Sequence, residues 1–416
     1  MVQIDSVKTT SVKPLSRNKL LGVAGTGWMF DAMDVGILSF IIAAIGIEWG
    51  LDPAQKGWIA SVNSIGMAVG AIFFGMLADK VGRKKIFMWT LLLFSIASGV
   101  SAFATTLTVF LILRFFIGMG LGGELPVAST LVSESVPAKE RGRVVVLLES
   151  FWAAGWLLAA IISYFVIPAD IWPFGMEGWR VALLLTALPA FYALYIRIKL
   201  PDSPQFEVKV ATKKRTFTQN LKEIWAKKHA RNTIMLWILW FAVVFSYYGM
   251  FLWLPSVMVG KGFDLISSFK YVLIMTLAQL PGYFTAAWFI EKMGRKFVLA
   301  TYLIGTAASA YVFGNADTIE VLLISGMLLS FFNLGAWGAL YAYTPEQYPA
   351  VIRGTGAGMA AGVGRVGGIL GPLLVGIMLD RGYDIGVIFT IFGAAILIGV
   401  ASVVFLGKET KQVELD

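Results

Sequence analysis

The chain has 416 residues, of which 58% are hydrophobic and only 14% are charged, and its mean hydropathy is +0.77. This composition excludes an ordinary soluble globular protein, because such proteins carry about 25% charged residues. The net charge of +9 could indicate nucleic-acid binding, but the placement of the basic residues favours a membrane protein. The absence of cysteine excludes disulfides and thiolate metal sites.

Apolar segments of about 18 residues or more recur along the chain and predict transmembrane helices. The segments are too long for the strands of a membrane barrel, so we expect an all-α membrane protein. The twelve expected spans are residues 20–45, 57–78, 86–104, 107–132, 144–167, 179–199, 233–259, 268–290, 297–314, 319–343, 354–379 and 384–406.

The basic residues predict the orientation of these helices. If both termini are cytoplasmic, only five of the 34 Lys and Arg residues fall in external loops, and two more fall inside helices. This positive-inside distribution predicts cytoplasmic termini and a multi-pass protein of the cytoplasmic (inner) cell membrane. The five external residues are Lys56, Arg180, Lys261, Lys270 and Arg381.

Two charged motifs occur twice with one offset of 212 residues. GMLADKVGRKK at 75–85 returns as AWFIEKMGRK at 287–296, and the motif at 134–142 returns at 346–354. The chain is therefore a duplication, and the paired loop motifs favour two halves that rock between two states. The residues expected to gate this movement are Gly75, Asp79, Gly82, Arg83, Glu134, Arg141, Glu291, Arg295, Glu346 and Arg353.

The duplication predicts two pseudo-symmetric six-helix bundles, at residues 20–199 and 233–406. The remaining segments are cytoplasmic: an N-terminal tail at 1–19, a linker at 200–232 and a C-terminal tail at 407–416. Apolar residues at helical spacing between 217 and 225 predict an amphipathic helix in the linker. In transporters built from such repeats, the substrate site lies near the membrane midplane between the halves.

Four charged residues of the first half are candidates for proton coupling. Asp31 and Asp34 stand three residues apart, on one face of their helix. Each costs about 2.5–3.5 kcal/mol near the bilayer centre, so both must face protein or water; a structural, hydrogen-bonded role is the alternative. Arg114 needs a buried counter-ion, for which Asp34 is the first candidate and Glu124 the second.

In the second half, Arg365 stands in a glycine-rich helix, and we find no intramembrane acid there to pair with it. A buried cation without a partner is costly, so an anionic substrate could supply the missing charge. The alternative partners are Glu149 of the first half and backbone carbonyl groups.

Aromatic residues accompany these charges, and the same segments contain few hydroxyl groups. This pattern suits a flat, apolar ligand with one charged end. A purely structural role remains open for Trp152 and Trp156, which lie on one helix face. Glycine and proline in 246–255 and 279–282 predict two bent or broken helices. The candidate ligand contacts besides Arg365 are Trp28, Trp152, Trp156, Tyr247, Tyr248, Gln279, Asn333 and Trp337.

These motifs resemble the major facilitator superfamily over nearly the whole chain. GMLADKVGRKK resembles the family's signature loop between its second and third helices. The motifs at 134–142, 201–204 and 345–354 resemble the sugar-porter-like branch. However, SYYGMFLWLPS replaces the glutamine-rich seventh helix of true sugar porters, which argues against a sugar substrate.

Two further resemblances concern charge. Asp31-Ala-Met-Asp34 resembles a motif of aromatic acid:proton symporters, in which those acids matter for transport, and Asp34 and Arg114 match an ion pair of proton-coupled sugar porters. The segment around Arg365 resembles the eleventh helix of organic anion transporters, whose cation-transporting relatives carry an acid there. These resemblances imply proton coupling and an anionic substrate.

FDAMDVGILSF, GGELPVASTLVSE and NLGAWGALYAYTPEQYP resemble the bacterial niacin permeases, which are kin of the synaptic-vesicle glycoproteins. That resemblance implies a secondary active transporter that imports nicotinate, with nicotinamide as a second candidate substrate. Arg365 would then hold the carboxylate, aromatic residues would wall the ring, and Asn333 would bind the ring nitrogen or the carboxylate.

Three alternatives remain: a proton symporter for another aromatic acid such as benzoate, an exporter of drugs or metabolites, and a membrane receptor that does not transport. An enzyme is not expected, because the single His229 lies in a basic segment and no metal-ligand cluster is present in the sequence. We also expect no cofactor other than the proton as coupling ion, no metal, no nucleic-acid partner, and a monomer in the lipid bilayer.

Overall fold

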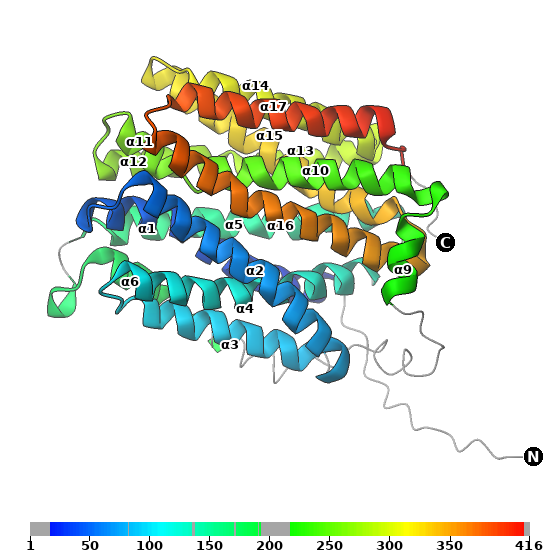
Figure 1. Cartoon of the computed structure of the whole chain (residues 1–416), viewed down its shortest axis with the longest axis horizontal. Coiled ribbons are helices and arrows are strands. Elements are labelled where there is room, and N and C mark those ends of the chain that lie inside the picture. The colour runs from blue at the N-terminus through cyan, green and yellow to red at the C-terminus, as the bar shows by residue number, and fades with distance from the viewer. Residues whose placement is uncertain are drawn as a thin grey trace, which may run out of the picture.

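The computed structural model describes residues 17–81, 83–134, 138–169, 172–189, 191–192 and 217–411. Among the side chains, those of 17–20, 23, 24, 75, 76, 78–84, 87, 123–142, 174, 217 and 350 lie outside this description. The described regular structure is helical throughout, and the long helices run side by side along the longest axis of the molecule (Figure 1). The all-helical class expected from the apolar segments is confirmed.

The helices of the two halves follow each other in chain order. The first half contains α1 (Arg17–Glu48), α2 (Pro53–Val81), α3 (Arg83–Ser101), α4 (Leu107–Glu134), α5 (Ala138–Val166), the 3-10 turn η1 (Pro173–Gly175) and α6 (Gly178–Leu185). The second half, after the short α9 (Phe217–Ile224), contains α10 (Lys227–Phe251), α11 (Leu254–Gly260), α12 (Leu265–Leu277), α13 (Gln279–Met293), α14 (Arg295–Gly314), α15 (Ile319–Glu346), α16 (Ala350–Asp380) and α17 (Ile385–Leu406).

Within the described residues, nine helical segments are long and apolar enough to cross a membrane, counting α12 and α13 as one. Two shorter apolar helices, Met88–Ser101 and Leu107–Gly122, occupy two more expected spans. The remaining expected span, 179–199, begins with α6 and continues beyond the described part of the chain. The chain is therefore a multi-pass membrane protein.

Both expected helix breaks are present. α10 ends at Phe251 and α11 starts at Leu254, with proline in its first turn, where the missing N–H costs no helical hydrogen bond. A single residue, Ala278, separates α12 from α13. α10 also begins at Lys227 rather than at 233, because the helix continues into the polar sequence that precedes the apolar span.

Glycine allows very close helix packing within the first half, where α2 crosses α4. A Cβ atom added at Gly70 would lie 1.9 Å from the Met119 carbonyl oxygen, and one added at Gly122 would lie 1.9 Å from that of Met67. No larger residue fits at either position, as expected for small residues between membrane helices. Gly122 of α4 and Gly70 of α2 therefore serve close packing of these two helices.

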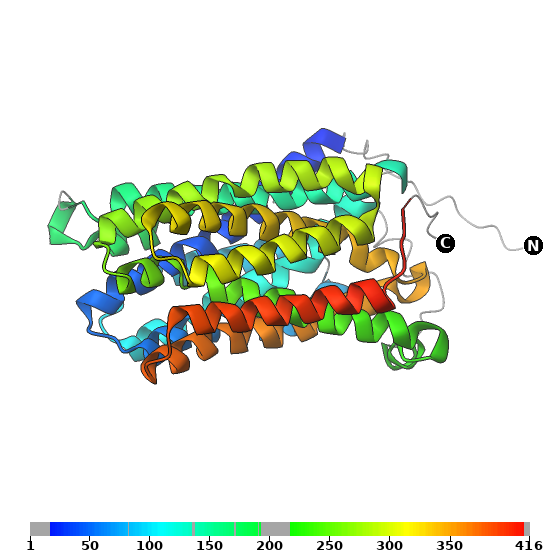
Figure 2. The same cartoon turned by 90° about the horizontal axis from the view of Figure 1, so that it is seen from above.

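The two halves meet along α5, which packs against α13 and α15, and along α2, which packs against α16. Ser61 of α2 donates a hydrogen bond to the carbonyl of Ile369 on α16 (2.8 Å). α9 and the C-terminal end of α17 lie at one end of the bundle, here called the linker end (Figures 1 and 2). The candidate site lies between these contacting helices.

Candidate functional site

A buried ion pair lies inside the first half. Arg114 Nη1 is 3.0 Å from Asp34 Oδ2, and both side chains are fully buried. Ser98 donates a hydrogen bond to the other oxygen of Asp34 (3.0 Å), and the Ser98 and Thr186 hydroxyl groups bond to each other. The predicted counter-ion of Arg114 is thus Asp34, and the side chain of Glu124 lies outside the description.

The rest of this polar site is also buried. Asp31 is only 2% exposed and lies one turn before Asp34 on α1. The Phe110 ring lies 5.5 Å from the Arg114 guanidinium carbon. Two guanidinium nitrogens of Arg114, Nε and Nη2, have no hydrogen-bond partner among the described residues. Among the described side chains, Asp34 is the acid that balances the charge of the buried Arg114.

Arg365 lies at the interface between the halves. It is partly buried on α16, and its Nη1 contacts Tyr248 Oη of α10 (3.3 Å) and Met67 Sδ of α2 (3.6 Å). Within the described side chains, no acid lies at ion-pair distance from Arg365, so the alternative pairing with Glu149 is not formed. Its positive charge is left for another partner.

Aromatic rings from both halves meet beside Arg365. Trp28 and Trp152 of the first half have ring centroids 5.2 Å apart, and Tyr247 and Trp337 of the second half are 4.7 Å apart. Trp152 Nε1 donates a hydrogen bond to Tyr247 Oη across the interface (2.7 Å). All four side chains are at most 4% exposed.

Further rings complete this group, which we call the aromatic cage. Tyr341 packs against Trp28 at 6.4 Å and against Trp240 at 5.1 Å, and so connects the halves a second time. Trp156 meets Tyr247 edge-on at 6.3 Å. The cage consists of Trp28, Trp152, Trp156, Trp240, Tyr247, Tyr248, Trp337 and Tyr341.

Glu149 of α5 borders the cage. It is 1% exposed, and its Oε2 accepts a hydrogen bond from Trp28 Nε1 (3.2 Å). Trp28 packs in turn against Tyr341, with ring centroids 6.4 Å apart, and Arg365 reaches the cage at Tyr248 (3.3 Å). An acid and a base therefore approach the cage from opposite halves of the protein.

Several polar atoms near the cage have no hydrogen-bond partner among the described residues. Both amide atoms of Asn333 and of Gln279 are fully buried in this state, as are Trp337 Nε1 and Tyr283 Oη. Asn333 lies one turn before Trp337 on α15, and Gln279 lies one turn before Tyr283 on α13. An unsatisfied buried polar group costs about 1–3 kcal/mol, which is a reason to expect a polar ligand or water here.

At the linker end, the second-half copy of the repeated motifs forms an ion network. Arg295 is 1% exposed and pairs with Glu291 (2.8 Å) and Glu346 (3.2 Å). The Glu291 carboxylate also accepts a hydrogen bond from the backbone N–H of Arg143 in the first half (3.2 Å). Arg353 donates to the backbone carbonyl of Pro345 (3.1 Å). These bonds join α13, α14 and α15 to each other and to α5.

Gly82 lies outside the described residues, and the other first-half gating residues lie where side chains are not described. Those residues are Gly75, Asp79, Arg83, Glu134 and Arg141.

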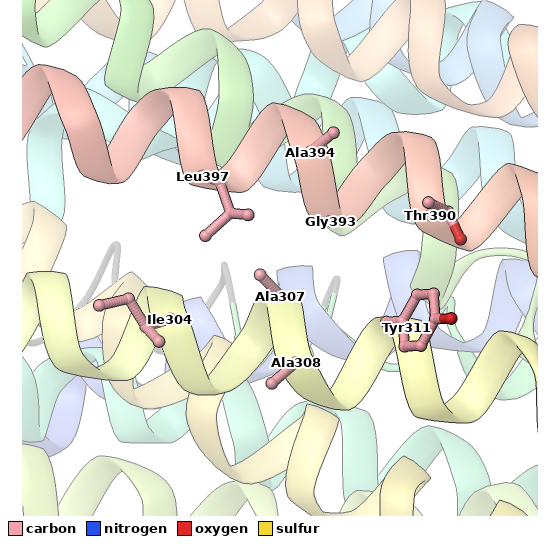
Figure 3. Close-up of a pocket in the computed structure, with 8 residues that line it drawn as sticks. All are labelled: Ile304, Ala307, Ala308, Tyr311, Thr390, Gly393, Ala394 and Leu397. Atoms are coloured by element: carbon pink, nitrogen blue, oxygen red, sulfur yellow. The ribbon is translucent and has the colours of Figure 1, made fainter.

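A separate groove lies on the outer surface between α14 and α17 (Figure 3). Its volume is about 360 Å³, and Tyr311 and Thr390 supply its polar side-chain atoms. Ile304 and Leu397, which face it, are about half exposed, so the groove borders the surface that would contact lipid. It contains neither charge nor cage residues and is distinct from the candidate site.

Sequence reasoning missed part of the site. Tyr341, Tyr283, Trp240 and Glu149 are not among the ligand contacts expected from the sequence. Tyr341 follows Trp337 by four residues, and Tyr283 follows Gln279 by four residues. That spacing places side chains on the same helix face. This signal could have identified Tyr341 and Tyr283, whereas Trp240 depends on how α10 meets α15.

Comparison with known proteins gives consistent matches. The profile of the Major Facilitator Superfamily matches residues 25–282 and 267–415. A Bacillus subtilis protein named as a niacin/nicotinamide transporter, NiaP, is 66% identical over 404 residues, which cover 97% of this chain and 99% of that protein. The niacin transporter NiaP of Acinetobacter baylyi is 48% identical over 95% of both chains. A synaptic vesicle 2-related protein of Xenopus laevis is 30% identical over 94% of this chain and 78% of its own length.

Solved structures match the fold. The xylose transporter XylE from E. coli, in a partially occluded inward-open conformation, aligns with a TM-score of 0.78 over 96% of this chain and 99% of XylE. XylE bound to 6-bromo-6-deoxy-D-glucose aligns with a TM-score of 0.76 over 95% of this chain and 96% of that one. Sequence identity is 19% in both cases, so these likenesses concern the fold alone.

Proposed function

Because the chain belongs to the major facilitator superfamily, we propose that it is a secondary active transporter that imports nicotinate by proton-coupled alternating access. As a member of that family it is a multi-pass membrane transporter and not an enzyme. The names of its two bacterial relatives support niacin as the substrate. The proposal includes twelve helices, cytoplasmic termini, the cytoplasmic membrane and a monomer; nicotinamide is a second candidate substrate.

The observation that carries the proposal is Arg365 beside the aromatic cage. Its guanidinium group has no acidic partner among the described side chains, and it is held by Tyr248 at the interface where the halves meet. A monocarboxylate would supply the missing charge in a bidentate geometry that suits arginine. The cage rings would cover the faces of a flat aromatic ring. Nicotinate is a pyridine ring with one carboxylate and combines both features.

Proton coupling has an energetic reason and a candidate site. Moving a monoanion into a negative-inside cell costs about 2.3 kcal/mol per 100 mV, and one accompanying proton removes this cost. Asp34 is fully buried beside Arg114. A change in the pairing of Asp34 with Arg114 between conformations would let Asp34 bind a proton on one side of the membrane and release it on the other. Asp31 and Glu124 would assist, and no further cofactor is required.

Counterflow exchange tests the substrate class without any imposed gradient. Proteoliposomes loaded with unlabelled nicotinate should take up labelled nicotinate. External unlabelled nicotinate should block this uptake, nicotinamide should block it more weakly, and xylose should leave it unchanged. Equal block by benzoate would favour a general aromatic-acid symporter. Nicotinate binding without exchange would favour a receptor.

An exporter is the other candidate. It would protect cells from toxic compounds without restoring growth of a niacin-requiring strain at limiting nicotinate. Restored growth on limiting nicotinate would support import.

A further inference from the structure

Glu149 has no part in the proton and substrate assignments made above. We propose that it binds the ring nitrogen of the substrate and thereby selects a pyridine over a benzene ring. This inference rests on the proposed transport of nicotinate and names the residue that would recognise the heterocycle.

The surroundings of Glu149 leave hydrogen-bonding capacity for a ligand. Among the described residues, Glu149 accepts one hydrogen bond, at Oε2 from Trp28 Nε1 (3.2 Å). No Lys or Arg among the described side chains lies at ion-pair distance from it. A carboxyl group that is 1% exposed and has one neutral donor is poorly compensated as an anion. A ligand that shares a proton with it would remove that cost.

The position of Glu149 relative to Arg365 fits a ligand with two polar ends. Glu149 reaches the cage from α5 at Trp28 (3.2 Å), and Arg365 reaches it from α16 at Tyr248 (3.3 Å). Trp28 bonds to Glu149 and packs against Trp152 and Tyr341, so the acid is fixed to the wall of the cage. With the carboxylate on Arg365, the ring would lie among the aromatic side chains and its nitrogen would face the first half.

The hydrogen bond requires one proton, shared between Glu149 and the ring nitrogen. Either the carboxylic acid donates to a neutral pyridine, or the pyridinium N–H donates to the carboxylate. Both forms have the same atoms and the same net charge, and no bond other than the O–H or N–H is made or broken. The assignment leaves Asn333, whose amide atoms are unpaired, for the carboxylate end.

Benzoate has the same ring size and the same carboxylate but no ring nitrogen. It would leave Glu149 buried without the partner that nicotinate offers, and sites built around a polar contact reject analogues that lack it. We therefore expect the wild-type protein to bind nicotinate about tenfold or more tightly than benzoate, as for one hydrogen bond to a charged group.

The test compares the ratio of the benzoate and nicotinate dissociation constants between variants of the purified full-length protein. Glu149→Leu should bring the ratio to about one, through weaker nicotinate binding with benzoate binding retained. Glu149→Gln keeps a donor for the ring nitrogen and should retain part of the preference. Ser150→Ala is the matched control on α5, because among the described residues the Ser150 hydroxyl bonds only to the carbonyl of Leu147 on its own helix. The ratio for this variant should equal that of the wild type.

The inference is overturned if Glu149→Leu keeps the wild-type ratio, whether both affinities are unchanged or both fall by the same factor; the latter result would show a structural role. A wild-type protein that binds both acids equally would also overturn it and would leave aromatic-acid transport standing. A wild-type protein that binds neither acid would instead contradict the proposed function.

Discussion

Trp152 of α5 donates a hydrogen bond of 2.7 Å to the hydroxyl of Tyr247 on α10, and so joins the two halves of the protein at the aromatic cage. Both residues are at most 2% exposed, so the bond is shielded from water. The bond ties two helices that must separate or slide if the halves rock. The strength of this bond should therefore affect both the equilibrium between conformations and the shape of the site.

Removing this bond should weaken substrate binding modestly. Tyr247→Phe keeps the ring, with its contacts to Trp337, but leaves the Trp152 N–H buried without its acceptor. We expect nicotinate affinity to fall about fivefold, corresponding to about 1 kcal/mol. Calorimetric titration measures this change. Tyr311→Phe in the outer groove is the control, and an equal loss there would contradict the assignment.

Arg365 should discriminate between charged and neutral ligands. Arg365→Ala is expected to weaken nicotinate binding by about 2 kcal/mol or more, roughly thirtyfold, because a charged hydrogen-bonded pair is lost. Nicotinamide carries no carboxylate, so the affinity of Arg365→Ala for nicotinamide should fall much less. Arg381→Ala, a charge change at the end of α16, should leave both affinities unchanged. If Arg365→Ala lost affinity for both ligands equally, the assignment of Arg365 as the carboxylate anchor would be wrong.

Asp34 and Arg114 should make strongly non-additive contributions to the free energy of unfolding. Asp34→Asn leaves the buried Arg114 without its anion and should destabilise the protein by about 3–5 kcal/mol. The double variant Asp34→Asn with Arg114→Met should recover much of this loss, because the cation that Asp34→Asn leaves without its partner is removed as well. Thermal unfolding in detergent measures the cycle. Additive losses would show that the two side chains do not depend on each other.

Proton coupling gives a separate prediction for the same residue. Asp34→Asn protein that remains folded should still exchange labelled for unlabelled nicotinate, since exchange needs no net proton movement. It should no longer accumulate nicotinate when the external solution is made acidic. Ser39→Ala on the same helix is the control, because the Ser39 hydroxyl donates its hydrogen bond to the carbonyl of Gly36 within α1. Gradient-driven accumulation by Asp34→Asn would place the coupling proton elsewhere.

The linker-end network should contribute to stability through Arg295. Arg295→Ala breaks the pairs with Glu291 and Glu346 and leaves Glu346 largely buried with an uncompensated charge. We expect a loss of about 3 kcal/mol in unfolding free energy. Lys292→Ala removes a charge that is exposed one turn away and should cost less than about 1 kcal/mol. Equal effects of the two substitutions would contradict a buried network.

The sequence predicts a polar contact when it offers few possible partners for a charged residue. Arg114 is permanently charged inside a helix, and the nearby acids left Asp34 or Glu124 as partners; the described structure shows Asp34. The breaks near 253 and 278 follow from proline and glycine alone. These features depend on local chemistry or on one scarce residue type.

The cage contacts were less predictable, because aromatic residues are abundant and pack in many ways. Fourteen tryptophans and thirteen tyrosines offer many possible pairs, and only the crossing of α5, α10 and α15 selects Trp152 with Tyr247. The bond between Trp28 and Glu149 depends in the same way on how α1 packs on α5. Periodicity assigns a side chain to a helix face but does not choose its neighbour on the next helix.

The most direct test of the account is accumulation of labelled nicotinate in proteoliposomes with an inward proton gradient, measured beside the same vesicles without a gradient. Proton-coupled import predicts transient accumulation above the external concentration, which a protonophore abolishes and which Arg365→Ala protein lacks. Uptake that only equilibrates and is indifferent to the gradient would contradict the central claim.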